Sequence, residues 1–338
     1  MAQRPTIHAV AARVGVSTAT VSKVVNGIET GVSAVTRAKV EAAVQELGYR
    51  PNRMGRNLRT QRYSTVGLVI LDPSPRFLAD PFTTNLVAGL ANYLNSRGFG
   101  LLLDGILPGK VESSFLIRGS AVDGLCLSLS GTRRQRIAVM RRIARLGQPI
   151  VVFQDLATPS LQDACFIRQD DRGGATILAR ALLKRKPRRA VVVVSTVPWP
   201  AVEQRVAGIR SVLEADGVHV DLVECDETSN EMIADAINRY LDREQPPDLI
   251  LGQNDQIAIA ALHVLRRHGL QVPQDVGVTG FNAFPFMDFA DPPLMTIRSA
   301  AYEMGERGAQ TMLGRLENGH FSDREVVLPV QFVAGASA

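Results

Sequence analysis

The sequence contains few of the features that mark an exported, membrane-spanning or disulfide-bonded protein. Its 338 residues include no run of about 18 apolar residues, the length that suggests a membrane span. The N-terminus lacks the apolar core of a signal peptide, so we expect a cytoplasmic protein with no membrane partner. The cysteines, Cys126, Cys165 and Cys225, are odd in number and lie in apolar or strand-like stretches. We therefore expect buried thiols in a reducing compartment.

Catalytic and metal-binding motifs are also missing from the sequence. No G-x-G-x-x-G follows a predicted strand, and no G-x-S-x-G motif is present. The stretch 105–111 approaches a phosphate-binding loop, but it is one residue short and lacks the final Ser or Thr. The histidines show no metal-ligand spacing; they are His8, His219, His263, His268 and His320. The sequence therefore predicts a protein that is not an enzyme, with no catalytic residues, metal or cofactor.

Positive charge is concentrated near the N-terminus. Residues 1–62 contain ten Lys or Arg and three Asp or Glu, a net charge of +7, whereas the whole chain carries +5. The remaining residues therefore carry 5 − 7 = −2. Clustered cations neutralise phosphates and release condensed counterions, which favours a nucleic-acid partner for this segment. A membrane surface fits less well, because no basic amphipathic helix with large apolar side chains is present.

Two short helices joined by a tight turn are predicted between Thr6 and Asn26. Thr6 and Ser17 can cap the helices, and Gly15 suits the turn because it lacks a Cβ atom. Valines occupy one face of the second helix, and small residues with one lysine occupy the other: Thr18, Ala19, Ser22 and Lys23. This pattern fits a helix-turn-helix whose second helix enters the major groove of DNA. It also fits a plain helical hairpin packed on a domain.

A third helix and a basic segment follow. The helix is predicted to begin at Ser33, with apolar residues at helical spacing and Gly48 as its stop. The segment 51–59 places Met54 and Leu58 on one helical face among arginines. Leu58 fits either a core position or a contact with a partner of this charged segment.

From Tyr63 onward, short apolar runs alternate with helical patterns. Strands are predicted at 65–71, 100–103, 124–129, 150–153, 190–195, 249–251 and 277–280, and helices at 81–97, 133–146, 172–183, 201–215, 231–242 and 256–268. This alternation is typical of parallel sheets with helical crossovers. Because about 276 residues are too many for one such sheet, we expect two lobes. Ligands of these folds bind beyond the carboxyl ends of the strands, which points to loops 72–82, 154–155, 195–205, 253–255 and 281–289.

The N-terminal segment resembles the headpiece of the LacI/GalR family of bacterial transcription regulators. The resemblance rests on Thr6, Ile7, Gly15, Val16, Ser17, Thr20, Val21, Ser22, Leu47, Gly48, Tyr49, Pro51 and Asn52, among others. The rest of the chain is similar to the family's effector domain, which resembles periplasmic sugar-binding proteins, at Asp123, Gly124, Ala207, Gly208, Asn254, Asp255, Gly280 and Phe281. The resemblance implies an α/β protein with a three-helix headpiece at 1–50, a hinge helix and linker at 51–62, and a two-lobed effector-binding and dimerisation domain at 63–338.

The resemblance also implies binding residues and partners. A homodimer would bind a pseudo-palindromic operator in double-stranded DNA through Thr6, Ser17, Thr18, Ala19, Ser22, Lys23, Asn26, Thr36, Asn52, Arg56 and Leu58, with Leu58 wedged into the minor groove. A small polar, sugar-like effector would bind between the lobes near Phe82, Asp155, Trp199, Arg205, Asn254 and Asn282. Four of these effector-site residues have a structural alternative: Asp155 can cap a turn, Asn254 can cap a helix, Arg205 can lie on a helix surface, and Trp199 can pack in the core.

Departures from the family's pattern leave the effector open. Asn282 and Ala283 stand where the family often has two acids, so one ligand-binding carboxylate is lost. Lys23 replaces the usual arginine of the reading helix and offers a point contact where arginine would bond guanine with two hydrogen bonds. The basic run 184–189 is either a phosphate or partner site or a solvated loop. Two further alternatives are a regulator controlled by a protein partner and a solute-binding protein without DNA function.

Overall fold

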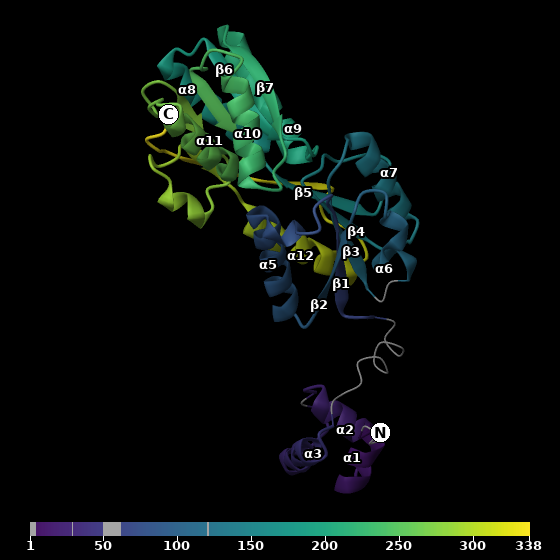
Figure 1. Cartoon of the computed structure of the whole chain (residues 1–338). Helices are drawn as coiled ribbons and strands as arrows, with labels where there is room; N and C mark the ends of the chain where they lie inside the picture. The colour runs from purple at the N-terminus through teal and green to yellow at the C-terminus, as the bar shows by residue number, and fades with distance from the viewer. Residues whose placement is uncertain (1–4, 29, 50–61, 120–121) are drawn as a thin grey trace. The chain divides into compact units, whose positions relative to one another are not determined.

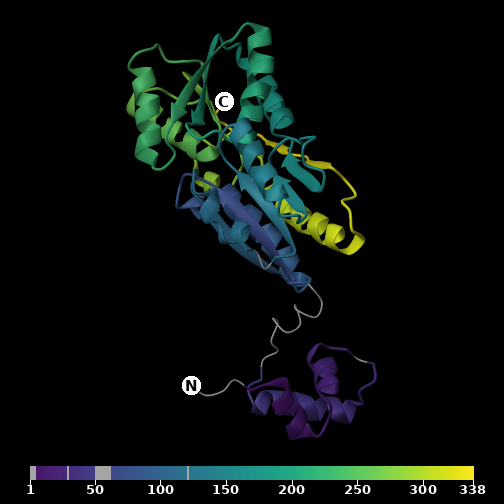
Figure 2. The same cartoon turned by 90° about the vertical axis from the view of Figure 1, so that its right-hand side faces the viewer.

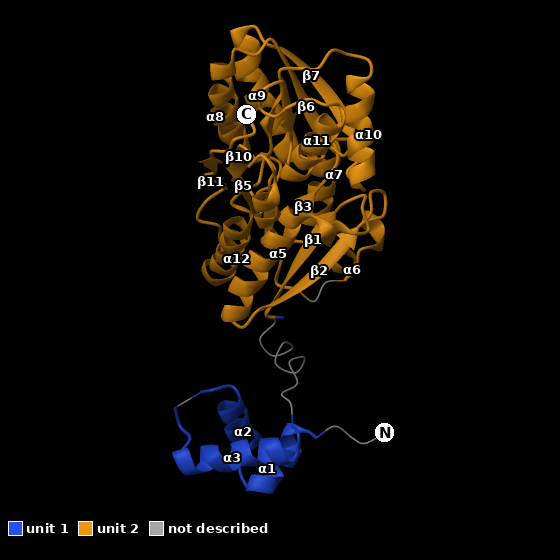
Figure 3. Ribbon diagram, turned by 60° about the vertical axis from the view of Figure 1, so that its left-hand side comes forward, with its two compact units in different colours: residues 1–63 blue, residues 64–338 orange. Residues whose placement is uncertain are grey.

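The structure is a computed structural model that describes residues 5–28, 30–49, 62–119 and 122–338. The chain divides into two compact units, residues 1–63 and residues 64–338 (Figure 3). Residues 51–61 of the predicted hinge segment lie outside the described residues. The hinge helix therefore stays a prediction.

The described part of the first unit consists of α1 (Ile7–Val14), α2 (Thr18–Val25) and α3 (Ala34–Glu46). Side-chain oxygens of Thr6, Ser17 and Ser33 accept hydrogen bonds from backbone N–H groups three residues later, so each helix has an N-cap. Gly15 takes the left-handed conformation, with φ 74°, between α1 and α2. The core of this unit is formed by Val10, Ala11, Val21, Val24, Val40 and Ala43. The three predicted helices and their caps are confirmed.

The first lobe of the second unit is built on a six-stranded parallel sheet. In spatial order its strands are β2 (Gly100–Ile106), β1 (Thr65–Leu71), β3 (Gly124–Leu129), β4 (Ile150–Phe153), β5 (Ala164–Gln169) and β11 (Glu325–Leu328). Helices α5 (Pro81–Ser96) and α12 (Ala301–Asn318) cover one face, and α6 (Phe115–Arg118) and α7 (Arg133–Ala144) cover the other (Figure 1). With both faces covered, the strands read as continuous apolar runs, which is why the sequence revealed most of them.

The second lobe has a four-stranded parallel sheet of the same kind. Its spatial order is β7 (His219–Cys225), β6 (Arg189–Ser195), β8 (Leu249–Gly252) and β9 (Gly277–Thr279). Helices α8 (Asp171–Leu182) and α9 (Pro200–Leu213) pack on one face, and α10 (Asn230–Leu241) and α11 (Asp255–Arg267) on the other. An antiparallel pair, β10 (Thr296–Arg298) and β12 (Gln331–Val333), belongs to this lobe.

The chain passes between the lobes after β5, after β10 and after β11. The yellow C-terminal part runs from α12 on the first lobe to a C-terminus on the second (Figure 2). Gln169 links two of these crossings, because its Oε1 accepts from Ser299 Oγ (3.0 Å) and the Ala300 N–H (2.9 Å). Its Nε2 donates to Asp171 Oδ1 at 2.9 Å. The crossings therefore share one buried hydrogen-bonded group.

The sequence did not reveal β5, β7, β10, β11, β12, α6 or α12. The strand β7 lies at a sheet edge and carries charged residues such as Asp221 and Glu224, so its apolar pattern is broken. Helix α12 contains Gly305 and Gly308, which lower helix propensity. A Cβ on Gly305 would lie 2.2 Å from the Leu86 carbonyl oxygen of α5. Close packing of α5 and α12 explains glycines that a single-sequence pattern cannot interpret.

Candidate DNA-reading surface and interlobe site

Helix α2 presents a narrow polar face on the first unit. Ala19, Lys23 and Asn26 are exposed, and Thr18 and Ser22 are half-buried, whereas Val21 and Val24 point into the core. This division between faces is the one predicted from the valine spacing. A slim face of this kind fits the major groove, which is about 12 Å wide.

Several predicted DNA contacts also hold this surface in shape. Asn26 Nδ2 donates to the Ser22 carbonyl at 2.6 Å and to Ser22 Oγ at 3.2 Å. The hydroxyls of Ser33 and Thr36 are hydrogen-bonded at 2.9 Å, and Thr6 and Ser17 cap α1 and α2. Their contact with DNA stays a prediction. Asn52, Arg56 and Leu58 lie outside the described residues.

Arg205 forms the centre of the second lobe's part of the predicted effector site. Its side chain on α9 is almost fully buried, and Nε donates to Asp171 Oδ1 at 2.8 Å. Nη1 donates to the Gln253 carbonyl at 2.6 Å, and Nη2 donates to Asn282 Oδ1 at 3.2 Å. The guanidinium carbon lies 3.8 Å from the centre of the Phe281 ring. These contacts exclude the alternative that Arg205 is a surface helix residue, and they leave two of its five N–H groups without an acceptor among the described residues.

Asp155, which follows β4, was predicted to contact a ligand. In the structure its carboxylate is hydrogen-bonded within the protein. Its Oδ2 accepts from Arg136 Nε at 2.7 Å, and its Oδ1 accepts from Arg136 Nη2 at 3.4 Å and the Leu156 N–H at 3.0 Å. Arg136 belongs to α7 and also contacts Glu203 of α9 at 3.1 Å. Burial opposes the charge on Arg136, but the two carboxylates raise the pKa of its guanidinium.

Asn254 and Gln253 follow β8 and share one carboxylate. Asn254 Oδ1 caps α11 by accepting from the Ile257 N–H at 2.9 Å, which confirms the capping alternative. Asn254 Nδ2 donates to Glu227 Oε1 (2.6 Å), and Gln253 Nε2 donates to Glu227 Oε2 (2.8 Å). The carbonyl oxygens Gln253 Oε1 and Gln154 Oε1 are buried and have no partner among the described residues. Buried polar atoms usually bind something, so these oxygens are candidate acceptors for a ligand.

The remaining predicted effector residues come from both lobes. Phe82 lies in the first turn of α5, half-buried against the core of the first lobe, and Trp199 is the half-buried N-cap residue of α9. At Asn282 and Ala283 the backbone has φ 112° and 52°, and at Gln154 it has φ 68°. Positive φ in residues other than glycine costs free energy and often occurs at binding sites. The predicted roles of these residues in ligand binding stay predictions.

Sequence reasoning missed Arg136, Asp171, Glu203 and Glu227. One signal was available for Arg136, because it falls on the same buried stripe of α7 as Met140 and Ile143. An arginine on the apolar face of a helix requires a buried partner. The basic run 184–189 is partly structural, since Arg189 pairs with Asp221 and Glu244 and Arg185 donates to the Pro273 carbonyl.

The buried carboxyl group of Asp255 makes the stability of the folded protein depend on pH. It begins α11, is 1% exposed, and accepts from Thr296 Oγ1 at 2.7 Å. Burial raises its pKa from 3.8 to about 6, against the effect of the Thr296 hydrogen bond. The folded protein therefore binds this proton more tightly than the unfolded chain. The resulting stability is fully present below pH 3.8 and is lost as the pH rises through 6.

We expect Asp255→Asn to remove this dependence. Between pH 5 and pH 7 the group should lower the free energy of unfolding of the wild type by about 1.4 kcal/mol, the value of one pKa unit. Urea unfolding at both pH values measures the difference. Asp216→Asn, at the exposed end of the short 3-10 helix Glu214–Asp216, is the control and should keep the wild-type slope. An unchanged slope in Asp255→Asn would contradict the assignment.

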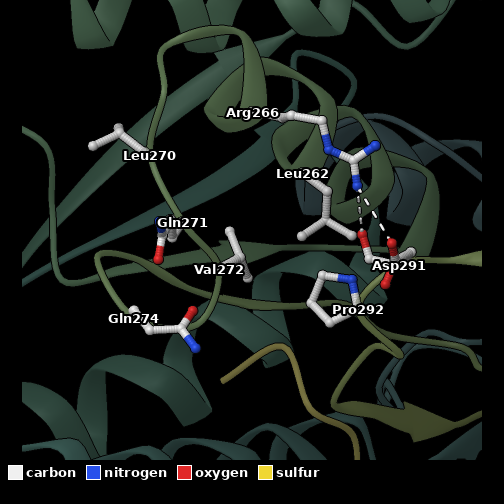
Figure 4. A pocket seen from close by; sticks show the side chains of 8 residues that line it. All are labelled: Leu262, Arg266, Leu270, Gln271, Val272, Gln274, Asp291 and Pro292. Carbon is white, nitrogen blue, oxygen red and sulfur yellow. Dashed lines mark hydrogen bonds and ion pairs between the residues drawn. The ribbon is translucent and has the colours of Figure 1, made fainter.

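Two pockets lie elsewhere on the second lobe. One, of about 350 Å³, is lined by Leu262, Arg266, Leu270, Gln271, Val272, Gln274, Asp291 and Pro292, and Figure 4 shows Arg266 reaching Asp291 across it. Another, of about 440 Å³, lies between α10, α11 and the short helix Pro285–Phe289. Within the described ranges, no group of three His, Cys, Asp or Glu is arranged to hold a metal ion. No helix in the described part of the chain is long and apolar enough to cross a membrane.

Comparison with known proteins identifies both units. Residues 6–52 match the model of bacterial regulatory proteins of the lacI family, and residues 179–338 match a periplasmic binding protein-like domain. The HTH-type transcriptional regulator CelR of Thermobifida fusca is 33% identical over 320 residues, which cover 93% of this chain and 92% of CelR. The chain belongs to the LacI family.

Solved structures of LacI family proteins agree with the fold. A CelR–cellobiose complex has 30% identity and a TM-score of 0.71, with 99% of this chain and 100% of that chain covered. The lac repressor dimer bound to operator and the anti-inducer ONPF has a TM-score of 0.86 at 24% identity, covering 99% of each chain, and supports the fold alone. As a member of the LacI family, this protein is a DNA-binding transcription regulator and not an enzyme. The family match to residues 6–52 excludes a solute-binding protein without DNA function.

Proposed function

We propose that a homodimer of this protein represses transcription in the cytoplasm by binding a pseudo-palindromic operator. The single observation that carries this proposal is the exposed small-polar face of α2 on a capped three-helix unit that matches the lacI family model. Two copies of α2 would enter successive major grooves, with Ser17, Thr18, Ala19, Ser22 and Lys23 nearest the DNA. Thr6, Asn26 and Thr36, with the hinge residues Asn52, Arg56 and Leu58, would contact the backbone and minor groove.

An apolar surface on the second lobe supports the homodimer. The 440 Å³ pocket is lined by Ala234, Ile259, Ala260 and Phe286 together with the polar residues Asn230, Gln256 and His263. Phe289, at the end of the same short helix as Phe286, is 91% exposed. Contiguous exposed apolar residues usually mark an interaction surface. A second copy of the chain would cover them and would hold two first units as a symmetric pair.

Between the lobes we propose a neutral, hydroxyl-rich effector of the sugar class. Hydroxyl groups both donate and accept, which suits a site containing the Arg205 N–H groups together with carbonyl and carboxylate acceptors. The acceptors are Gln154 Oε1, Gln253 Oε1 and the Glu227 carboxylate, with Phe82 and Trp199 offering apolar faces. Asn254 and Asn282 add amide groups. The cellobiose bound to the related CelR is of the same chemical class.

Selection of bound fragments from random duplex DNA tests the operator part of this proposal. We expect the selected sequences to share a pseudo-palindrome whose half-sites lie about one helical turn, or a multiple of it, apart. Fluorescence anisotropy of the selected duplex, with and without a panel of mono- and disaccharides, tests the effector part. One sugar should change operator affinity by about 5- to 150-fold, the usual range of allosteric coupling. DNA binding that no sugar changes would instead favour control by a protein partner.

A further inference from the structure

Arg136 joins the two lobes through a hydrogen-bonded cluster formed by the chain's own side chains. It lies in α7 on the first lobe and is 1% exposed. Nε and Nη2 donate to Asp155 of the same lobe, whereas Nη1 and Nη2 donate to Glu203 of α9 on the second lobe, at 3.1 and 3.4 Å. Nη1 also donates to the Gly131 carbonyl. All five N–H groups of this guanidinium therefore have a protein acceptor.

A backbone contact between the lobes lies beside this cluster. The Gly131 N–H donates to the Pro198 carbonyl at 2.8 Å, which joins the loop after β3 to the loop after β6. Gly131 has φ 100°, a conformation that suits glycine and lets one residue use its N–H across the lobes and its carbonyl toward Arg136. The capping box of Thr132 and Gln135 holds the start of α7 next to it. The contact thus rests on a locally ordered turn.

The contrast with Arg205 shows what the cluster does. Arg205 contacts only residues of the second lobe and keeps two N–H groups for another partner. Arg136 has none left, and three of the about four acceptor sites of the Asp155 carboxylate are used by Arg136 and the Leu156 N–H. Asp155 therefore keeps about one acceptor site for a ligand hydroxyl, and most of its hydrogen-bonding capacity is used within the protein. Its carboxylate orients and neutralises a buried guanidinium.

We infer that Arg136, Asp155 and Glu203 form an interlobe clasp that holds the lobes together before any effector binds. Asp155 is a positioning residue that acts on the effector site through Arg136. The residues that contact the effector directly lie around Arg205. This inference concerns the regulation of the proposed effector site and rests on that proposal for its biological role. The clasp is formed by side chains of this chain alone, so it can be tested separately. By favouring the arrangement of the lobes seen in this structure, it would raise the fraction of molecules in that arrangement and so change the apparent affinity for effector.

Distances between the lobes in the full-length, ligand-free protein test the clasp. Spin labels are attached through Ala138→Cys on α7 and Arg243→Cys after α10, both exposed positions on different lobes. The native cysteines are buried, so the introduced thiols react first. The labelled protein is compared with the same protein carrying Glu203→Gln, which removes the charge, or Glu203→Ala, which removes every acceptor. Glu214→Gln is the matched control, because it breaks the Arg210–Glu214 pair of the second lobe alone.

We expect double electron–electron resonance to show a narrow distribution of distances between the two spin labels, both in the wild type and in Glu214→Gln. In Glu203→Ala the population of longer distances should rise about fivefold, the upper end for an ion pair with one exposed member. In Glu203→Gln the population of longer distances should lie between those of the wild type and Glu203→Ala. If both Glu203 variants give the same distance distribution as the wild type, the proposed clasp is wrong.

Operator binding by the same samples separates the two proposals. If the wild type selects no operator, the proposed function fails while the distance result still decides the clasp. If the wild type binds operator and the Glu203 variants keep the wild-type distances, the clasp alone fails.

Discussion

Replacing Arg205 by methionine is expected to lower the free energy of unfolding of the second unit by about 3–5 kcal/mol, the usual cost of breaking a buried ion pair. The substitution leaves Asp171 without its cation inside the protein, where, among the described residues, the Gln169 amide is the one remaining donor to it. Burial already raises the pKa of Asp171, and the charge of Arg205 counteracts that rise. Removing the guanidinium also frees the Gln253 carbonyl and the Asn282 side chain.

Urea unfolding at pH 7 measures this loss. Trp199, the only tryptophan, is the N-cap residue of α9, so its fluorescence reports unfolding of the helix that carries Arg205. Arg210→Met is the control on the same helix and should cost about 1 kcal/mol or less, because its ion pair with Glu214 is exposed. Adding Asp171→Asn to Arg205→Met should recover much of the stability, since it removes the unpaired charge. Equal midpoints for Arg205→Met and Arg210→Met would contradict a structural ion pair.

Replacing Lys23 by glutamate is expected to weaken operator binding about 100-fold. Lys23 is the cation on the exposed face of α2, and one good base or phosphate contact contributes about 1–3 kcal/mol. Charge reversal removes that contact and adds repulsion from the phosphates. The substitution should also lower the slope of log affinity against log salt by about one or more.

Anisotropy of the selected operator over a series of salt concentrations checks this expectation. Lys184→Glu makes the same change in net charge at an exposed position of the second unit and serves as the control. It should leave operator affinity close to that of the wild type. If both variants lose affinity equally, the effect comes from net charge, and α2 is not the reading helix.

Local patterns were sufficient for the first unit. Thr6, Ser17 and Ser33 act on N–H groups three residues away, and the valines of α2 follow helical spacing, so both features can be read within one turn of chain. Seven of the ten strands of the two parallel sheets could be found from their apolar runs, whereas β5, β7 and β11 could not. Helix α12 could not, since its glycines make sense only against α5, more than 200 positions away in the numbering.

The chemistry of the interlobe site was only partly predictable. The loops after the strands were located correctly from the alternation of strands and helices, and Arg205 and Asn282 do meet there. The partner of Asp155 was not foreseen. Arg136 lies 19 residues before it, and Glu203 lies 67 residues after Arg136, so nothing in local spacing connects the three.

The amino-acid sequence by itself determined the short helices with their caps and the parallel α/β architecture, because these depend on short-range periodicity and capping residues. The regulator family was indicated by residues that match the family's pattern along the chain. Only the tertiary structure decided which polar side chains near the lobes are committed to one another and which keep hydrogen-bonding capacity. A buried charge without a partner costs free energy, so Arg136 and Arg205 each need acceptors close by. Which residues supply these acceptors depends on the three-dimensional fold. That proximity separates the proposed clasp around Asp155 from the proposed ligand site around Arg205.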